Sequence, residues 1–309
     1  MVLTAGIEAG GTSFVVSIAD NSADNVVNRA RFPTTSDPVK TMQQCINWIK
    51  QNNENPAAIG IAAFGPICLK KTSPNYGRIE KTPKEGWTHF ELLKYMKTAF
   101  PDIPIGIDTD VNGAAIAELV HGVGKGSDMS SLVYVTIGTG IGVGILVNGV
   151  ALIGMSHAEA GHIRVQRRKD DTFEGVCPFH NDCVEGLASA AAISARCQIH
   201  ESKLVDVDDS HSVWDIIGFY LGQLCANLFL ILSPECIVLG GGVSKRQIIL
   251  PAVRKYFSEM IAGYVDYPES LIQLSQLDVG AGVIGSHLLA YQELQDLSQR
   301  PTIKSAKYL

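Results

Sequence analysis

The feature that most constrains this chain is a glycine-rich turn, Gly138-Thr139-Gly140, between two apolar segments typical of strands, 132–135 and 145–147. Because glycines have no Cβ atom, such a turn lets backbone N–H groups approach an anion, and the threonine hydroxyl adds a donor. We therefore expect Gly138, Thr139 and Gly140 to hold a nucleotide phosphate. A glycine-rich bend in a core sheet explains the same stretch equally well. A dinucleotide site would need a helix directly after the glycines, and a strand follows instead.

The same pattern occurs near the N-terminus, where Gly10, Gly11 and Thr12 lie between the strand-like segments 5–9 and 13–18. Two such hairpins that face each other would grip a triphosphate from both sides, as in a kinase cleft between two lobes. The second occurrence therefore favours phosphate binding at both turns.

Composition narrows the class of protein. The chain has 309 residues, which suits two domains better than one core, and 46% hydrophobic and 18% charged residues fit a soluble globular protein. The net charge of −6, without a long basic run, gives no support for a nucleic-acid or membrane partner. We expect no membrane span and no secretion signal. Seven cysteines, an odd number, indicate reduced thiols in a cytoplasmic protein.

Strands and helices alternate along the chain, which is typical of an α/β protein, and the hairpins make its sheets mixed. Besides the hairpins, we expect strands at about 25–32, 57–63, 103–107, 236–239 and 272–274. We expect helices at about 38–52, 90–100, 113–121, 187–198, 213–232, 246–262 and 281–294, a long irregular loop at 158–186, and a polar, mobile tail from Ser298.

Polar or rigid residues follow several of the predicted strands. Asp110 and Asn112 lie between a strand end and a helix start, where a carboxylate can act as a general base from a fixed platform. Helix capping by Asp108 or Asp110 explains the same residues equally well. Gly65 and Pro66 follow the strand 57–63, at the edge where ligands collect in α/β sheets.

Three glycines, Gly240, Gly241 and Gly242, separate the strand 236–239 from the helix predicted at 246–262. Such a bare backbone surface suits a planar adenine and its ribose. A helix entry under tight packing is the alternative.

A cluster of metal-ligand residue types lies in the long loop. Cys177, His180 and Cys183 fall within one turn-rich stretch, and His162 lies upstream. Two cysteines and two histidines suit tetrahedral Zn²⁺ with no open position, which implies a structural metal. Unrelated surface residues are the alternative, and a disulfide between Cys177 and Cys183 fits a cytoplasmic protein poorly.

Taken in order, these motifs resemble the ROK sugar kinases, which belong to the actin-like, ribonuclease-H-like ATPase superfamily. The resemblance covers nearly the whole chain. It rests on Glu8-Ala9-Gly10-Gly11-Thr12, Asp110-Val111-Asn112, Thr136 to Gly142, Glu159-Ala160-Gly161-His162, the Cys/His loop and Gly240-Gly241-Gly242. The Cys177–Cys183 loop and the segment Thr82 to Trp87 are similar to the bacterial fructokinase and mannokinase branch.

The resemblance implies a two-lobed actin-like α/β fold with mixed sheets and a zinc-binding loop. The smaller lobe would comprise residues 1–113 and about 284–309, and the larger lobe residues 114–283 with the zinc loop at 162–183. It also implies a homodimer, ATP and Mg²⁺ as cofactors, and a free hexose as the substrate.

The resemblance also implies roles for individual residues. Asp110 would take the proton from the reacting sugar hydroxyl. Sugar-binding residues would be Gly65, Pro66, Asn112, Glu159, His162 and Glu185. Phosphate-binding residues would be Gly10, Gly11, Thr12, Gly138 and Thr139, with Gly241 and Gly242 at the adenosine. His162 would serve twice, with one ring nitrogen on zinc and the other toward the sugar.

The chain departs from the family pattern at three places. Glu8 stands where most members have Asp, and Ser13 stands where the motif usually has Lys, which removes a cation near the phosphates. Ala190-Ala191 replaces the usual Gly-Pro.

The function expected from the sequence is ATP-dependent phosphorylation of fructose to fructose 6-phosphate. Mannose or glucose is the alternative substrate, and a non-catalytic sugar sensor is a further alternative. Sugar-binding repressors of the family carry an N-terminal DNA-binding segment, for which we expect no room ahead of a hairpin that begins at Gly6.

Overall fold

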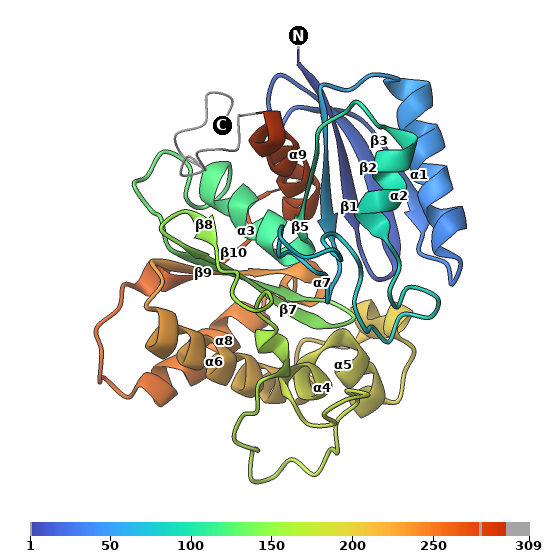
Figure 1. Ribbon diagram of the computed structural model, residues 1–309. Coiled ribbons are helices and arrows are strands. Elements are labelled where there is room, and N and C mark those ends of the chain that lie inside the picture. Colours follow the sequence, from blue (N-terminus) through green and yellow to red (C-terminus); the bar gives the residue numbers. More distant parts are fainter. Residues whose placement is uncertain (1, 278–279, 295–309) are drawn as a thin grey trace. The chain divides into compact units, whose positions relative to one another are not determined.

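The computed structural model describes residues 2–277 and 280–294 (Figure 1). The tail predicted from Ser298 lies outside the described residues. Contacts between Cα atoms divide the chain into two compact units. The first runs to Ser130 and includes Gly144–Ala158 and the chain from Gln276 on, and the second comprises Ser131–Val143 and Glu159–Ser275.

The first unit is built on a five-stranded mixed sheet of order β3-β2-β1-β4-β5. Its strands are β1 (Leu3–Ala9), β2 (Ser13–Asp20), β3 (Val26–Pro33), β4 (Ala58–Ala63) and β5 (Ile105–Thr109). β1 pairs antiparallel with β2 and parallel with β4, so the glycine turn Gly10–Thr12 closes the first hairpin. The mixed sheet confirms the prediction from the hairpin.

Helices cover both faces of this sheet (Figure 1). They are α1 (Pro38–Asn52), α2 (Leu92–Ala99), α3 (Asp110–Val120) and α9 (Ala281–Leu294). Asp37 caps α1, accepting a hydrogen bond from the Lys40 N–H, as its position before Pro38 predicts. On the α1 face, the buried Trp87 packs on Phe14 and Phe64 with ring centroids 5.2 and 5.4 Å away.

On the other face, α9 packs directly on the strands through a row of glycines. Gly6 on β1 is in register with Gly60 on β4, which is in register with Gly106 on β5. A Cβ atom on Gly60 would clash with the backbone of Ser286 in α9, and one on Gly106 would clash with the Leu289 carbonyl. The glycines therefore allow close approach of helix and sheet.

A buried histidine of α9 lies between helix and sheet. His287 is hydrogen-bonded to the Thr4 hydroxyl through Nδ1, at 2.9 Å, and to the Ser17 hydroxyl through Nε2, at 2.8 Å. Burial lowers the pKa of His287 to about 3, so the ring is neutral in the folded protein.

The second five-stranded sheet has the order β10-β9-β6-β7-β8. Its strands are β6 (Leu132–Ile137), β7 (Ile141–Val147), β8 (Val150–Ala151), β9 (Cys236–Gly240) and β10 (Ile272–Leu274). The β6–β7 hairpin carries the turn Gly138–Gly140, as predicted, and β9 runs parallel to β6 and β10. By contacts, the end of β7 and all of β8 group with the first unit.

The helices of the second unit are α4 (Val184–Ala188), α5 (Ala190–Cys197), α6 (Val213–Leu232), α7 (Gly241–Ser244) and α8 (Ile249–Ile261). α6 is long and apolar enough to cross a membrane, although the sequence predicts no span. In the structure α6 packs against α8, and most of its length is buried, as expected of a core helix.

Two helix predictions need correction. The helix predicted after 186 begins at Val184 and breaks at Ser189, because Ser189 is extended and its side chain caps α5 by accepting from the Ala192 N–H. The helix predicted at 246–262 corresponds to α8, which begins later, at Ile249, and a separate short helix, α7, forms ahead of it at the glycines. The short 3₁₀ helix Glu201–Asp206 was not predicted.

The two units do not coincide with the lobes expected from the family resemblance, 1–113 with about 284–309 and 114–283. Contacts keep α3 and residues 144–158 with the first unit, because α3 packs on α9 and Gly144 lies against the backbone of Val111 in α3. The expected lobe boundaries stay a prediction.

We predict that Gly60→Ala lowers the free energy of unfolding by about 1–3 kcal/mol, the cost of forcing extra volume into a tightly packed contact. Urea titration followed by circular dichroism measures it. The matched control is Gly154→Ala, where an added Cβ meets nothing within 4 Å. Equal stability of the two variants would contradict the glycine-mediated packing.

We also predict a pH dependence that belongs to His287. The pKa of His287 is about 3 in the folded protein and about 6.5 in the unfolded chain, so between pH 3 and pH 6.5 only the unfolded chain binds a proton at this residue. The contribution of neutral His287 to the free energy of unfolding is complete above pH 6.5 and is lost as the pH falls toward 3. Between pH 7 and 5.5 the wild type should lose about 1 kcal/mol more stability than His287→Gln. His89→Gln, at an exposed histidine, should keep the wild-type slope, and an unchanged slope in His287→Gln would refute the assignment.

Candidate functional site

The turn Gly10–Thr12 joins β1 to β2 in the first unit and is held by its neighbours. The Gly10 N–H donates to the Ser13 carbonyl at 3.1 Å, and the Thr34 hydroxyl donates to the Gly10 carbonyl at 2.8 Å. Gly11 and Thr12 are exposed, and a Cβ atom on Gly11 would meet nothing within 4 Å. The turn is therefore fixed at its base and open at its tip, as an anion site requires.

Asp110 is the first residue of α3, directly after β5. The helix is capped by Thr109, whose hydroxyl accepts from the Asn112 N–H at 3.0 Å, so capping by Asp108 or Asp110 is wrong. Asp110 Oδ1 accepts from the adjacent Val111 N–H at 2.9 Å. The helix dipole favours a carboxylate in the first turn of a helix, and Asp110 occupies such a position at a strand end.

Asn112 is 3% exposed and lies in the first turn of the same helix, two residues after Asp110. Its side-chain amide donates to Asp108 Oδ1 at 2.7 Å, and Asp108 also accepts from the Thr109 N–H at 2.7 Å. Asn112 therefore braces the start of α3 from within.

Gly65 and Pro66 follow β4 and are joined by a cis peptide bond. The next residue, Ile67, donates its N–H to Nε2 of the buried His157 at 3.1 Å. Burial lowers the pKa of His157, so its ring is neutral and Nε2 can accept. His157 thus anchors the Gly65-Pro66 turn, a role that the sequence analysis missed although His157 directly precedes the Ala158–His162 motif.

In the second unit, the turn Gly138–Gly140 is tied to two helices. The Ala190 N–H at the start of α5 donates to the Gly138 carbonyl at 2.8 Å. The Ile141 N–H donates to Glu185 Oε2 of α4 at 3.0 Å.

Three of the predicted sugar-binding residues lie together in this unit. Glu185 Oε1 is 3.9 Å from His162 Nε2. Burial raises the pKa of Glu159, the nearby Glu185 carboxylate raises it further, and His162 opposes both effects. The cluster therefore has a partly compensated negative charge and several oxygen acceptors, which suits hydroxyl groups as ligands.

His162, Cys177, His180 and Cys183 converge, with one ligand atom from each lying within 4.8 Å of the others. His162 Nδ1 is 3.6 Å from Cys177 Sγ and 3.5 Å from Cys183 Sγ, and His180 Nδ1 is 3.6 Å from Cys177 Sγ. The two cysteines are buried and the two histidines partly so. Two thiols and two imidazoles that enclose one point fit Zn²⁺ well.

This convergence excludes the alternative of unrelated surface residues. The disulfide alternative is also wrong, because none of the seven cysteines, all within the described residues, forms a disulfide. His162 turns Nδ1 toward the two sulfurs and Nε2 toward Glu185, so its two ring nitrogens face different partners. Its predicted double role, on zinc and toward the sugar, stays a prediction.

The glycines after β9 show features of both interpretations of that stretch, a tightly packed helix entry and an open backbone surface. Gly241 has φ +83, and a Cβ atom there would crowd the Ile137 backbone, as tight packing at a helix entry predicts. A Cβ atom on Gly242 would meet nothing within 4 Å. Gly242 is thus the part of the segment that presents open backbone.

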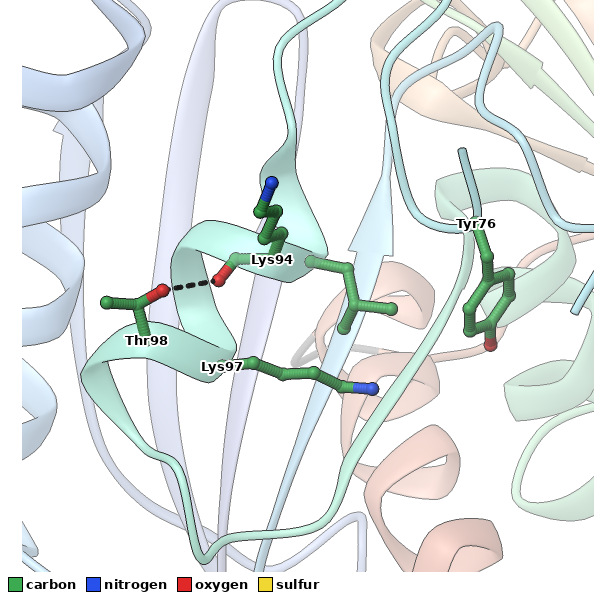
Figure 2. Close-up of a pocket in the computed structure, with 5 residues that line it drawn as sticks. Tyr76, Lys94, Lys97 and Thr98 are labelled. Atoms are coloured by element: carbon green, nitrogen blue, oxygen red, sulfur yellow. Dashed lines mark hydrogen bonds between the residues drawn. The ribbon is translucent and has the colours of Figure 1, made fainter. Parts of the chain in front are cut away.

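A surface pocket of about 330 Å³ lies beside α2 in the first unit. It is lined by Tyr76, Leu93, Lys94, Lys97 and Thr98. Figure 2 shows the Thr98 hydroxyl donating to the Lys94 carbonyl along α2, at 3.0 Å. None of the residues predicted to act in function takes part in it.

Comparison with known proteins agrees with the motifs. The chain is 41% identical over 290 residues to a fructokinase from Lactococcus lactis subsp. cremoris, covering 92% of this chain and 96% of the relative. It is 37% identical over 297 residues to a fructokinase from Pediococcus pentosaceus, covering 96% and 100%.

Among solved structures, a ROK family glucokinase from Streptomyces griseus, crystallised with glucose and AMPPNP, superposes with a TM-score of 0.75 at 23% identity. The match covers 94% of this chain and 99% of that one, which confirms the predicted fold. The pattern of the ROK family matches residues 4–293. The chain therefore belongs to the ROK family.

Proposed function

We propose that this protein transfers the γ-phosphoryl group of ATP to fructose, giving fructose 6-phosphate and ADP. The observation that carries the proposal is Asp110, a carboxylate fixed at the first residue of α3 and at the end of β5. The choice of fructose follows the fructokinases that are 37% to 41% identical over nearly the whole chain.

In the proposed reaction, Asp110 accepts the proton of the sugar 6-hydroxyl as its oxygen attacks the γ-phosphorus. The bond from that phosphorus to the bridging oxygen breaks, and ADP leaves with the electron pair. Such a transfer is accelerated mainly by positioning and by neutralising charge. A base on a rigid strand end, with its ionised form favoured by a helix N-terminus, meets the first requirement.

The nucleotide is proposed to bind to backbone. Gly10, Gly11 and Thr12 in one unit and Gly138 and Thr139 in the other would donate to phosphate oxygens, and Gly241 and Gly242 would lie against the adenosine. Mg²⁺ would accompany the phosphates, since it is usually held by substrate phosphates and one or two carboxylates.

Side chains are proposed to bind the sugar. Glu159, His162 and Glu185 would supply hydrogen-bonding groups for its hydroxyls. Asn112 lies two residues after Asp110, and Gly65 and Pro66 would form a wall whose shape His157 fixes. The contacts of Asn112 with Asp108 support a role in holding Asp110 in place as well.

Zn²⁺ is proposed to be held by His162, Cys177, His180 and Cys183. A closed four-ligand zinc site contributes folding energy and no chemistry of its own. The ion would fix the loop 162–183, and His162 would be oriented with its Nε2 toward Glu185. A cytoplasmic homodimer, as expected from the family resemblance, completes the proposal, since reduced cysteines suit that compartment.

The first test is ADP formation with fructose, mannose, glucose and N-acetylmannosamine, beside Asp110→Asn. We predict turnover with fructose and a loss of at least about a hundredfold in kcat for the variant, the scale of a removed general base. Asp102→Asn, at an exposed carboxylate, is the matched control and should retain full activity. Turnover by none of the sugars would refute the kinase, and preference for another sugar would correct the substrate.

A second prediction concerns the metal. The purified protein should contain about one zinc ion per chain by mass spectrometry, and Cys183→Ser should lower both the zinc content and the melting temperature. A thiolate ligand is lost, and with it part of the folding energy that the metal supplies. Cys197→Ser, at a half-buried cysteine outside the cluster, is the control. Zinc-free protein with wild-type stability would rule out the structural metal.

A further inference from the structure

An arginine lies beside the first phosphate turn. Arg31, exposed near the end of β3, donates from Nη1 to the Ser13 hydroxyl at 2.8 Å. Ser13 is the residue directly after the turn Gly10–Thr12. The guanidinium is thus held one residue away from the backbone groups proposed to bind phosphate.

Sheet register explains why the arginine reaches this point. Arg31 on β3 lies opposite Val15 on β2, which lies opposite Glu8 on β1. Residues directly opposite one another point to the same face, and so does Ser13, two positions before Val15. Arg31, Ser13 and Glu8 therefore share one face at the end of the hairpin.

Glu8 gives the guanidinium a second, electrostatic partner. Burial raises the pKa of Glu8, and the charge of Arg31 acts in the opposite direction and lowers it. Glu8 is half-buried next to Gly282 of α9. The Ser13 hydroxyl thus holds the arginine near the turn, and Glu8 is an opposite charge close enough to act on it.

The turn Gly10–Thr12 carries no cation that could pair with a phosphate. Gly10, Gly11 and Thr12 offer only neutral donors, whereas the phosphates of a nucleotide carry several negative charges. A guanidinium is always charged, has five N–H donors in a rigid fork, and pairs with phosphate oxygens in a bidentate manner. Arg31 donates from Nη1 to the Ser13 hydroxyl, and its fork carries further N–H donors that a phosphate could accept from.

We propose that Arg31 is the cation of the nucleotide site, pairing with phosphate oxygens of ATP and ADP, and that Ser13 positions it. The proposal deepens the proposed function, because it rests on phosphate binding at the turn Gly10–Thr12. A purely structural role, in which Arg31 only ties β3 to β2, is the competing explanation.

Calorimetry with ADP tests the proposal without any turnover. Arg31→Gln should weaken ADP binding about tenfold, at the lower end of what a charge-assisted hydrogen bond contributes, because the pair is exposed and screened. In the kinase assay KM for MgATP should rise by a similar factor, with KM for fructose unchanged. The matched control is Arg29→Gln, which removes the same charge from the same strand, opposite Ser17.

A double variant distinguishes a cation that binds phosphate from a side chain that only ties β3 to β2. In Ser13→Lys/Arg31→Gln, an ammonium group stands at the residue whose hydroxyl accepts from Arg31 in the wild type. This variant should recover most of the ADP affinity that Arg31→Gln loses. A tether cannot be restored in this way, so failure of the rescue, or ADP affinity in Arg31→Gln within twofold of Arg29→Gln, overturns the proposal.

The outcomes also distinguish this proposal from the kinase itself. Wild-type protein that binds ADP but phosphorylates no sugar refutes the kinase, and Arg31→Gln still decides the role of the arginine. If the wild type phosphorylates fructose and Arg31→Gln keeps its nucleotide affinity, only the proposed role of Arg31 is refuted. Wild-type protein that binds no nucleotide refutes both.

Discussion

Backbone-to-backbone packing of α9 is the constraint on which the first unit depends. The glycine row on β1, β4 and β5 lets the helix lie directly on the sheet. A further close contact, between Gly285 of α9 and Gly113 of α3, sets how the two helices cross. Because α3 begins with Asp110, the position of the proposed base follows from a helix at the other end of the chain. Tight packing transmits such constraints since interiors have little room to adjust.

The same constraint explains what the sequence could and could not predict. Elements with strong local signals were found, such as α1 with its Asp37 cap and Pro38, and the apolar α6. The break at Ser189 was missed because it lies in a run of small residues that reads as one helix. The pairing of the glycine row was missed because register between distant strands is not a local property.

The site residues show the same difference between local sequence signals, which allow prediction, and tertiary contacts, which do not. The four metal-ligand residues were predicted because their types and spacing are visible in one short stretch, and they do converge. Thr109 replaces the expected aspartates as the cap of α3, and the support of the Gly65-Pro66 turn by His157 depends on tertiary contact. Glu185 was predicted as a sugar ligand, but its bond to the Ile141 N–H, which links the phosphate hairpin to the His162 cluster, appears only in three dimensions.

The metal cluster has a consequence for how the protein reaches its folded state. All four ligand residues lie between 162 and 183, so capturing an ion requires the closure of a short loop only, at a modest cost in chain entropy. The pairing of β6 with β9, in contrast, joins strands separated by the whole of that loop and by α6, and such distant pairings form slowly. Binding of the proposed ion would therefore order the loop 162–183 without requiring the second sheet to form first.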